Sequence, residues 1–284
     1  MLGNLTRRTP RPEAWGVPQM RQRRVLITGA GSGLGQALAL RYARSGAAVA
    51  CADLLLERSR QTVAMLEGTG HLALQVDVGK DDAYEAMVRE LATHWDSIDV
   101  LVNNAGIASG GPMVETSMEE WRLLMEVNLL SVVRGCRVFA PGMIAQGEGH
   151  IVNTASFAGL AAAPSIMSYG VSKAGVVALS EQLRAELHPY GVRVSVLCPA
   201  FFPTRLLEGW TGSDRMRGFA QKMMERSGDT LDAVADRAFA AVERGDFLVL
   251  PTKKEPMRWR LKRWFPGLYF RQLLKLGESR SRGD

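Results

Sequence analysis

Three residues in the second half of the chain have the types and spacing needed for proton transfer. Tyr169 and Lys173 are four residues apart, so on a helix their side chains would share one face. A tyrosine hydroxyl, with a pKa of about 10, is a weak base at neutral pH, but a neighbouring ammonium favours the phenolate. Ser156 lies thirteen residues before Tyr169, and its hydroxyl would hold a substrate oxygen. The three residues predict general acid/base chemistry on an alcohol or carbonyl group.

A glycine-rich turn joins a short apolar run at 24–27 to a helical pattern at 36–45. The turn reads Thr28-Gly29-Ala30-Gly31-Ser32-Gly33-Leu34-Gly35. At such a turn, backbone N–H groups and the helix dipole favour an anion, and glycines let the backbone approach it closely. The glycine spacing is T-G-x-x-x-G-x-G and does not fit the common dinucleotide pattern G-x-G-x-x-G. The turn predicts a phosphate-binding site.

A carboxylate ends the next apolar run, at Asp53. In a nucleotide-binding unit, an acid at this point accepts hydrogen bonds from the adenosine ribose and repels a 2′-phosphate. Asp53 therefore favours NAD over NADP. The same residue type also suits the N-cap of the following helix, and both roles are compatible.

Short apolar runs alternate with helical patterns along most of the chain. This alternation predicts which candidate residues follow strands and which lie on helices. The expected strands are 24–27, 47–53, 71–76, 98–103, 150–155, 192–197 and 247–250. The expected helices are 36–45, 54–67, 80–94, 118–144 (two helices or a bent pair), 168–188 and 231–244. Such alternation predicts an α/β fold, a single doubly wound domain over 21–252 with a parallel sheet of about seven strands.

The alternation stops at 201–227, where apolar residues are interleaved with glycines and charges. We expect a mobile lid over the substrate here. The side chains expected to contact the substrate are Ser156, Phe157, Leu160, Phe201, Leu206 and Trp210. None of them is charged, so an apolar secondary alcohol or ketone is the predicted substrate. The alternative is that several of them fill the core.

The positive charge lies at the two ends of the chain. Residues 1–24 hold six Arg and one Glu, and 253–284 hold ten Lys or Arg against three acids. Residues 25–252 are acidic, so the net charge of +6 does not indicate nucleic-acid binding. We expect residues 1–20 to be a disordered arm and 253–284 a helical extension. Aromatic residues spaced among basic ones suit a helix that lies on an anionic membrane. They equally suit a helix packed over the substrate pocket or against a neighbouring subunit, and we favour the packed helix.

Cysteine and histidine show no pattern of metal binding or nucleophilic catalysis. Cys51, Cys136 and Cys198 lie in apolar surroundings without metal-ligand spacing, as expected of buried reduced thiols. No metal site is predicted. No secretory or membrane-spanning segment stands out, which favours a cytoplasmic location, with peripheral membrane contact open through the tail.

These motifs together resemble the short-chain dehydrogenase/reductase family over about residues 23–252. The matching positions are Thr28-Gly29-x-x-x-Gly33-x-Gly35, Asn103-Asn104-Ala105-Gly106, Asn128, Ser156, Tyr169-x-x-x-Lys173 and Pro199…Thr204. One departure is Ala200, where the family usually has glycine. The resemblance implies a Rossmann fold and a homodimer or homotetramer, and Asp53 makes NAD the expected cofactor, with NADP disfavoured.

The resemblance also implies individual roles. Tyr169 would exchange the proton with the substrate, Lys173 would lower its pKa and hold the nicotinamide ribose, and Ser156 would orient the substrate. Asn128, the fourth catalytic residue, would keep a water in a proton relay with Lys173. The residues that would contact the cofactor are Gly29, Ser32, Gly33, Leu34, Gly35, Asp53, Asp77, Val78, Asn104, Ala105, Gly106, Tyr169, Lys173, Pro199, Phe202 and Thr204.

Two classes of function follow from these patterns. The first is an oxidoreductase that moves a hydride between NAD(H) and an apolar secondary alcohol or ketone. The second is a non-catalytic dinucleotide-binding regulator that has kept the fold. The complete set Asn128, Ser156, Tyr169 and Lys173 favours the enzyme, because a binding protein has no need of it.

Overall fold

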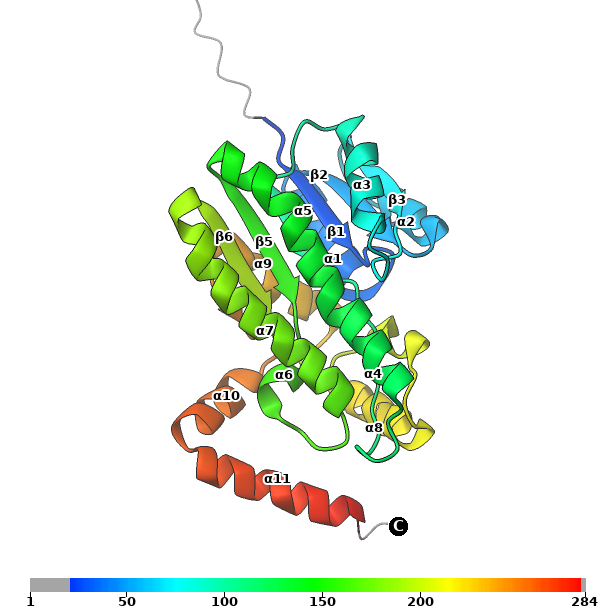
Figure 1. The fold of residues 1–284 in the computed structure, drawn as a ribbon, viewed down its shortest axis with the longest axis vertical. Helices are drawn as coiled ribbons and strands as arrows, with labels where there is room; N and C mark the ends of the chain where they lie inside the picture. Colours follow the sequence, from blue (N-terminus) through cyan, green and yellow to red (C-terminus); the bar gives the residue numbers. More distant parts are fainter. Residues whose placement is uncertain (1–20, 282–284) are drawn as a thin grey trace, which may run out of the picture.

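The computed structural model describes residues 21–281, which form a parallel sheet between two layers of helices (Figure 1). The strands are β1 Arg24–Thr28, β2 Ala48–Asp53, β3 Leu72–Gln75, β4 Val100–Asn103, β5 Gly149–Thr154, β6 Val192–Leu197 and β7 Leu248–Val249. The predicted doubly wound fold with seven strands is confirmed. The arm expected over 1–20 lies outside the described residues.

The order of the strands creates a point where the chain changes direction across the sheet. The order is β3-β2-β1-β4-β5-β6-β7, and all the strand pairs are parallel. The chain therefore moves outward from β1 in one direction and then returns to place β4 on the other side of β1. Ligands of open α/β sheets bind beyond the carboxyl ends of the strands at such a switch point.

Both faces of the sheet are buried, because alternate side chains of each strand point to opposite helical layers. Leu26 and Leu101 belong to one core and Ile27 and Val102 to the other. The first core is completed by α3 Ala83–Ala92, α5 Ser131–Gln146 and α7 Met167–Leu187. The second is completed by α1 Gly33–Arg44, α2 Leu56–Val63 and α9 Leu231–Arg244. This burial on both sides explains the nearly continuous apolar runs in the sequence.

Several elements differ in detail from the expected ones. The long pattern at 118–144 is α4 Met118–Met125 followed by α5, joined through the π-helical turn η1 Glu126–Leu130. The segment 201–227 contains the 3-10 turn η3 Arg205–Gly209 and a helix that the sequence analysis missed, α8 Asp214–Glu225. The remaining helices are α6 Ala158–Ala161, η2 His188–Tyr190, α10 Glu255–Trp264 and α11 Pro266–Ser281.

Two polar side chains hold the carboxyl ends of β1 and β4 together. The Thr28 hydroxyl accepts hydrogen bonds from the backbone N–H groups of Asn104, at 3.0 Å, and Ala105, at 3.1 Å. The Asn104 side-chain amide donates to the carbonyl oxygen of Thr28 at 3.1 Å. Thr154, at the end of β5, donates to the Asn104 side-chain oxygen at 3.4 Å. The ends of three neighbouring strands are thus fixed relative to one another.

We predict that Thr28→Val destabilises the fold by about 2 kcal/mol, because two backbone N–H groups at a partly buried site lose their acceptor. Thr28→Ser is the matched control, since it keeps the hydroxyl. Urea unfolding followed by circular dichroism measures both variants. A Thr28→Val protein at least as stable as Thr28→Ser would contradict the role given to this hydroxyl.

Candidate active site

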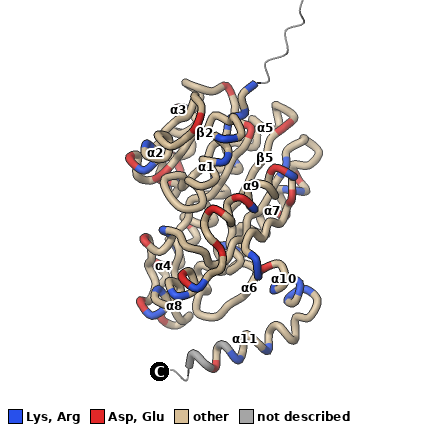
Figure 2. Tube along the Cα trace, turned by 180° about the vertical axis from the view of Figure 1, so that it is seen from behind, with Lys and Arg blue, Asp and Glu red and all other residues tan. Residues whose placement is uncertain are grey.

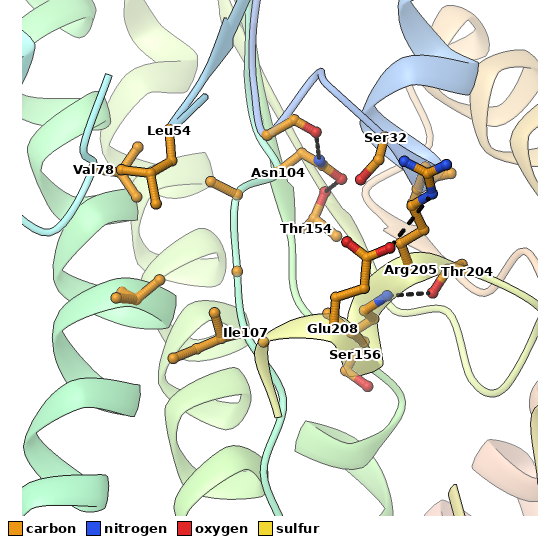
Figure 3. Close-up of a pocket in the computed structure, with 18 of the residues that line it drawn as sticks. Ser32, Leu54, Val78, Asn104, Ile107, Thr154, Ser156, Thr204, Arg205 and Glu208 are labelled. Carbon is orange, nitrogen blue, oxygen red and sulfur yellow. Dashed lines mark hydrogen bonds and ion pairs between the residues drawn. The ribbon is translucent and has the colours of Figure 1, made fainter. Parts of the chain in front are cut away.

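A cleft of about 570 Å³ opens at the switch point between β1 and β4 (Figure 3). All the residues expected to contact a cofactor line it except Gly35. Ser156, Tyr169 and Lys173 line the same cleft. The structure therefore brings the glycine-rich turn and the candidate proton-transfer residues, more than a hundred residues apart in sequence, to one cavity.

The glycines of the turn serve different purposes. Gly29 and Gly33 have φ angles of +64° and +56°, which side-chain-bearing residues rarely adopt. A Cβ on Gly31 would lie 2.7 Å from a carboxylate oxygen of Asp53. A Cβ on Gly35 would lie 2.3 Å from the carbonyl oxygen of Gly29, so Gly35 lets α1 begin directly behind the turn. Gly35 thus shapes the turn from behind and does not line the cleft.

Asp53 is held in the cleft by two backbone N–H groups. One carboxylate oxygen accepts from Gly31 at 3.0 Å and the other from Leu55 at 3.1 Å. The first of these bonds fastens the carboxylate to the glycine-rich turn. The second is a local side-chain-to-backbone bond in the turn before α2. The N-cap role expected for Asp53 is corrected, because the N-cap residue of α2 is Leu55, whereas the ribose-binding role stays a prediction. The carboxylate has further lone pairs with which to accept from a ligand hydroxyl.

An ion pair crosses the cleft near Asp53. Arg58, on α2, donates to Glu208, on η3, at 2.9 Å, and the two residues are 150 positions apart. The stem of Arg58 lies against the glycine-rich turn, because a Cβ on Gly31 would come within 2.5 Å of the Arg58 Cβ. This guanidinium is therefore already paired with a carboxylate.

Ser156 and Lys173 have defined positions beside Tyr169. The Ser156 hydroxyl accepts from the backbone of Ala158 at 3.1 Å, and its side chain also interacts with the Tyr169 hydroxyl. Lys173 is 3% exposed, and its ammonium donates to the carbonyl oxygen of Thr154 at 2.9 Å. Ser156 follows β5, whereas Tyr169 and Lys173 lie on α7, so packing of α7 against the sheet assembles the group.

Burial dominates the acid–base properties of this group. It raises the pKa of Tyr169, while the hydrogen bond with Ser156 acts in the opposite direction. Burial lowers the pKa of Lys173 from 10.5 to about 8. Desolvation of the phenolate is the largest influence on the pKa of Tyr169. The expectation that Lys173 lowers this pKa stays a prediction.

Asn128 supports the site from behind and is fully buried in η1. Its amide exchanges two hydrogen bonds with the backbone of Ile107, at 2.9 and 3.0 Å, and donates to Ser172 at 3.2 Å. A Cβ on Gly106 would lie 3.0 Å from the Asn128 oxygen and 3.2 Å from the Lys173 nitrogen. Asn128 therefore lies close to Lys173, but its side chain is committed to positioning the loop after β4.

The expected substrate residues separate into two groups. Ser156 and Leu206 line the cleft, as expected. The prediction that Phe157 and Leu160 contact the substrate is corrected. Both side chains are buried in the core on the α7 side of the sheet, because Phe157 directly precedes the short helix α6 and Leu160 lies within it. Phe201 packs edge-on against Phe219, and the Trp210 indole donates to the carbonyl of Ser213 at 3.2 Å, so neither faces the cleft. The core-filling alternative holds for Phe157 and Leu160.

Other apolar side chains line the cleft and were not anticipated. They are Leu54, Val76, Ile107, Leu123, Val127, Ala155 and Met224. Ile107 had a usable signal, because it directly follows the Asn104-Ala105-Gly106 motif. Leu123 and Met224 come from α4 and α8, whose distance from the motifs in sequence gave no signal.

The cysteines and one histidine do not take part in this site as nucleophiles. Cys51, Cys136 and Cys198 are buried free thiols, as predicted, and burial raises the pKa of each to about 12. Burial lowers the pKa of His150 to about 3, and its ring lies 2.9 Å from the Ser195 hydroxyl. Within residues 21–281, no cluster of three His, Cys, Asp or Glu side chains is arranged to hold a metal ion.

We predict that Lys173→Met stabilises the protein at pH 7 by about 2 kcal/mol. The pKa of Lys173 is about 8 when folded and 10.5 when exposed, so the unfolded chain binds more protons between these values. The wild-type protein therefore gains stability as pH rises from 8 to 10.5, and the advantage of the variant should shrink over that range. Chemical unfolding at pH 7 and pH 10.5 measures this, with the exposed Lys222→Met as control. A stability difference independent of pH would contradict the prediction.

Comparisons with known proteins agree with this site. Residues 23–214 match the family model described as short chain dehydrogenase. Meso-2,3-butanediol dehydrogenase of Serratia marcescens is 34% identical over 224 residues, covering 79% of this chain and 89% of that protein. The structure of a short-chain dehydrogenase/reductase from Burkholderia phymatum in complex with NAD has a TM-score of 0.80 at 32% identity, covering 87% of this chain and 95% of that one.

The match to a mycobacterial relative is confined to part of that protein. Probable oxidoreductase EphD of Mycobacterium tuberculosis is 34% identical over 247 residues, which cover 82% of this chain. This chain spans about two fifths of its length, since the match covers 40% of that protein. The family model and the Serratia relative each cover well over half of the present chain. The chain therefore belongs to the short-chain dehydrogenase/reductase family of NAD(P)-binding oxidoreductases.

Proposed function

We propose that this protein is an NAD-dependent oxidoreductase that interconverts an apolar secondary alcohol and its ketone. The observation that carries the proposal is the convergence of Ser156, Tyr169 and Lys173 on the cleft that holds the glycine-rich turn. A dinucleotide along this cleft would place its nicotinamide beside Tyr169 and its adenosine beside Asp53. The Serratia relative, named for 2,3-butanediol, supports a secondary alcohol as the substrate class.

The residues at the adenosine end fit NAD. The positive φ angles of Gly29 and Gly33, and the lack of side chains at Gly31 and Gly35, provide a cradle for a pyrophosphate. Asp53 would accept hydrogen bonds from the ribose hydroxyls and repel a 2′-phosphate. Arg58, the nearest cation on α2, is paired with Glu208 and is less available to a 2′-phosphate.

The proposed mechanism assigns a separate role to each polar side chain. Bound NAD would supply the hydride acceptor for oxidation. For oxidation, Tyr169 would first release its own proton to water, and the resulting phenolate oxygen would take the alcohol proton as the hydride passes to NAD. Ser156 would hold the substrate oxygen by a hydrogen bond. Because burial raises the pKa of Tyr169, the Lys173 ammonium is needed to stabilise the phenolate as it forms. Lys173 would also donate to the nicotinamide ribose.

Asn128 would be a positioning residue, because its side-chain amide already forms hydrogen bonds with Ile107 and Ser172. If a water links Asn128 to Lys173, the main-chain carbonyl of this π-helical turn is the group left to bind it. Such turns often occur at functional sites. The proposed substrate contacts are Ser156, Leu206 and Ile107, which combine one hydroxyl with two apolar walls.

We predict that Tyr169→Phe lowers kcat by at least about a hundredfold, because the proton acceptor is lost, while the Kd for NADH stays within about threefold. A panel of apolar secondary alcohols, monitored by NADH formation, measures turnover, and NADH fluorescence measures binding. Tyr190→Phe, at an exposed position, is the control. Normal turnover by Tyr169→Phe would exclude the mechanism. NADH binding without turnover of any alcohol by the wild type would favour the regulatory alternative.

We also predict a preference for NADH over NADPH of at least about tenfold in Kd, which Asp53→Asn should reduce, because the repulsion of a 2′-phosphate is removed. Fluorescence titration of both cofactors measures the preference. Glu57→Gln is the control, since it removes a nearby carboxylate that does not line the cleft. Equal binding of the two cofactors by the wild type would contradict the role of Asp53.

A further inference from the structure

The C-terminal helices form an arm that is attached to the body at a few points. The arm comprises residues 253–281, with α10 and α11 joined at Phe265, and α11 runs along one end of the molecule (Figure 1). The Tyr269 hydroxyl donates to the carbonyl of Ala161 at 2.9 Å, and the Lys262 ammonium donates to the carbonyl of Leu160. Trp259 packs against the first core, the one that contains Leu26 and Leu101. The packed arrangement favoured from the sequence accounts for these residues.

Other large apolar side chains of the arm remain exposed. Trp264 is 73% exposed, Phe265 61% and Phe270 57%. The exposed large apolar residues of the arm whose side chains the structure describes, which we call the arm patch, are Met257, Trp264, Phe265, Leu268, Phe270 and Leu274. Packing against the body does not explain six exposed large apolar side chains on two joined helices, and such exposure is typical of an interaction surface.

Basic side chains are interleaved with the arm patch. Arg260 and Arg263 on α10, and Arg271 and Lys275 on α11, are all exposed. Residues 253–281 contain nine Lys or Arg and two acids, whereas residues 25–252 contain 19 and 25 (Figure 2). The arm is therefore strongly cationic, whereas residues 25–252 are acidic. Its charge complements an anionic surface, and its aromatic residues suit the interface between lipid headgroups and acyl chains.

We propose that the arm binds the surface of an anionic membrane, with the arm patch inserted at the interface and the basic residues against lipid headgroups. Among residues 21–281 no helix is both long and apolar enough to cross a bilayer, so the contact is with the surface. The arm is held by α6, which begins two residues after Ser156. On the function proposed above, this contact would bring the substrate end of the cleft toward lipid-dissolved alcohols.

Vesicle sedimentation with the full chain tests the proposal without relying on activity. We expect binding to vesicles of phosphatidylcholine with 30% phosphatidylglycerol, weak binding to phosphatidylcholine alone, and release by 0.5 M NaCl. A protein that stays in solution, or binds both vesicles equally in either salt, would overturn the proposal. NADH binding, measured in parallel, separates this result from any failure of the proposed enzymatic function.

Two sets of variants separate the apolar and the charged contributions. Trp264→Ala/Phe265→Ala/Phe270→Ala and Arg260→Gln/Arg263→Gln/Arg271→Gln should each reduce partitioning at least about tenfold. The matched controls are Met65→Ala/Tyr190→Ala and Arg60→Gln/Arg89→Gln/Arg137→Gln, at exposed positions outside the arm, and they should bind as the wild type does. Equal losses in the controls would overturn the proposal. A dimer in solution that the aromatic triple variant dissociates, without vesicle binding, would instead assign the arm patch to a second copy.

Discussion

The hydrogen bonds between Thr28 and Asn104 are the constraint on which the site depends. They join the ends of β1 and β4, the two neighbouring strands between which the chain reverses its direction across the sheet. The glycine-rich turn leaves the sheet from one of these ends, and the loop that Asn128 positions leaves from the other. Thr154 extends the connection to β5, the strand before Ser156. A few polar groups therefore align the glycine-rich turn with Ser156, Tyr169 and Lys173 in one cleft.

The site also shows a conflict between stability and chemistry. Lys173 is nearly completely buried, which lowers its pKa to about 8, and the same burial raises the pKa of Tyr169. An apolar side chain at this buried position would make the folded protein more stable than a buried cation does. The stability lost by burying the Lys173 ammonium is consistent with the proposed mechanism. A cation stabilises a phenolate most strongly when both are shielded from water.

The fold and most of the site were predictable from local patterns, and the errors have physical causes. Apolar runs reveal strands because the sheet is buried on both faces, and the glycine-rich turn and Asp53 line the same cleft, as their positions after two strands predicted. Phe157 and Leu160 were misplaced because a helix of four residues shows no periodicity. The Arg58–Glu208 pair joins positions 150 residues apart, which no local pattern connects. The raised pKa of Tyr169 depends on burial, which residue spacing does not reveal.

The most direct test of the account is the transfer of deuterium from a secondary alcohol labelled at its carbinol carbon. The protein would be incubated with NAD and a panel of such alcohols, and the reduced cofactor would be analysed by mass spectrometry and NMR. We predict one deuterium per NADH, at a single face of nicotinamide C4. NADH that carries no deuterium, or the absence of transfer from every alcohol by a protein that binds NAD, would contradict hydride transfer in this cleft.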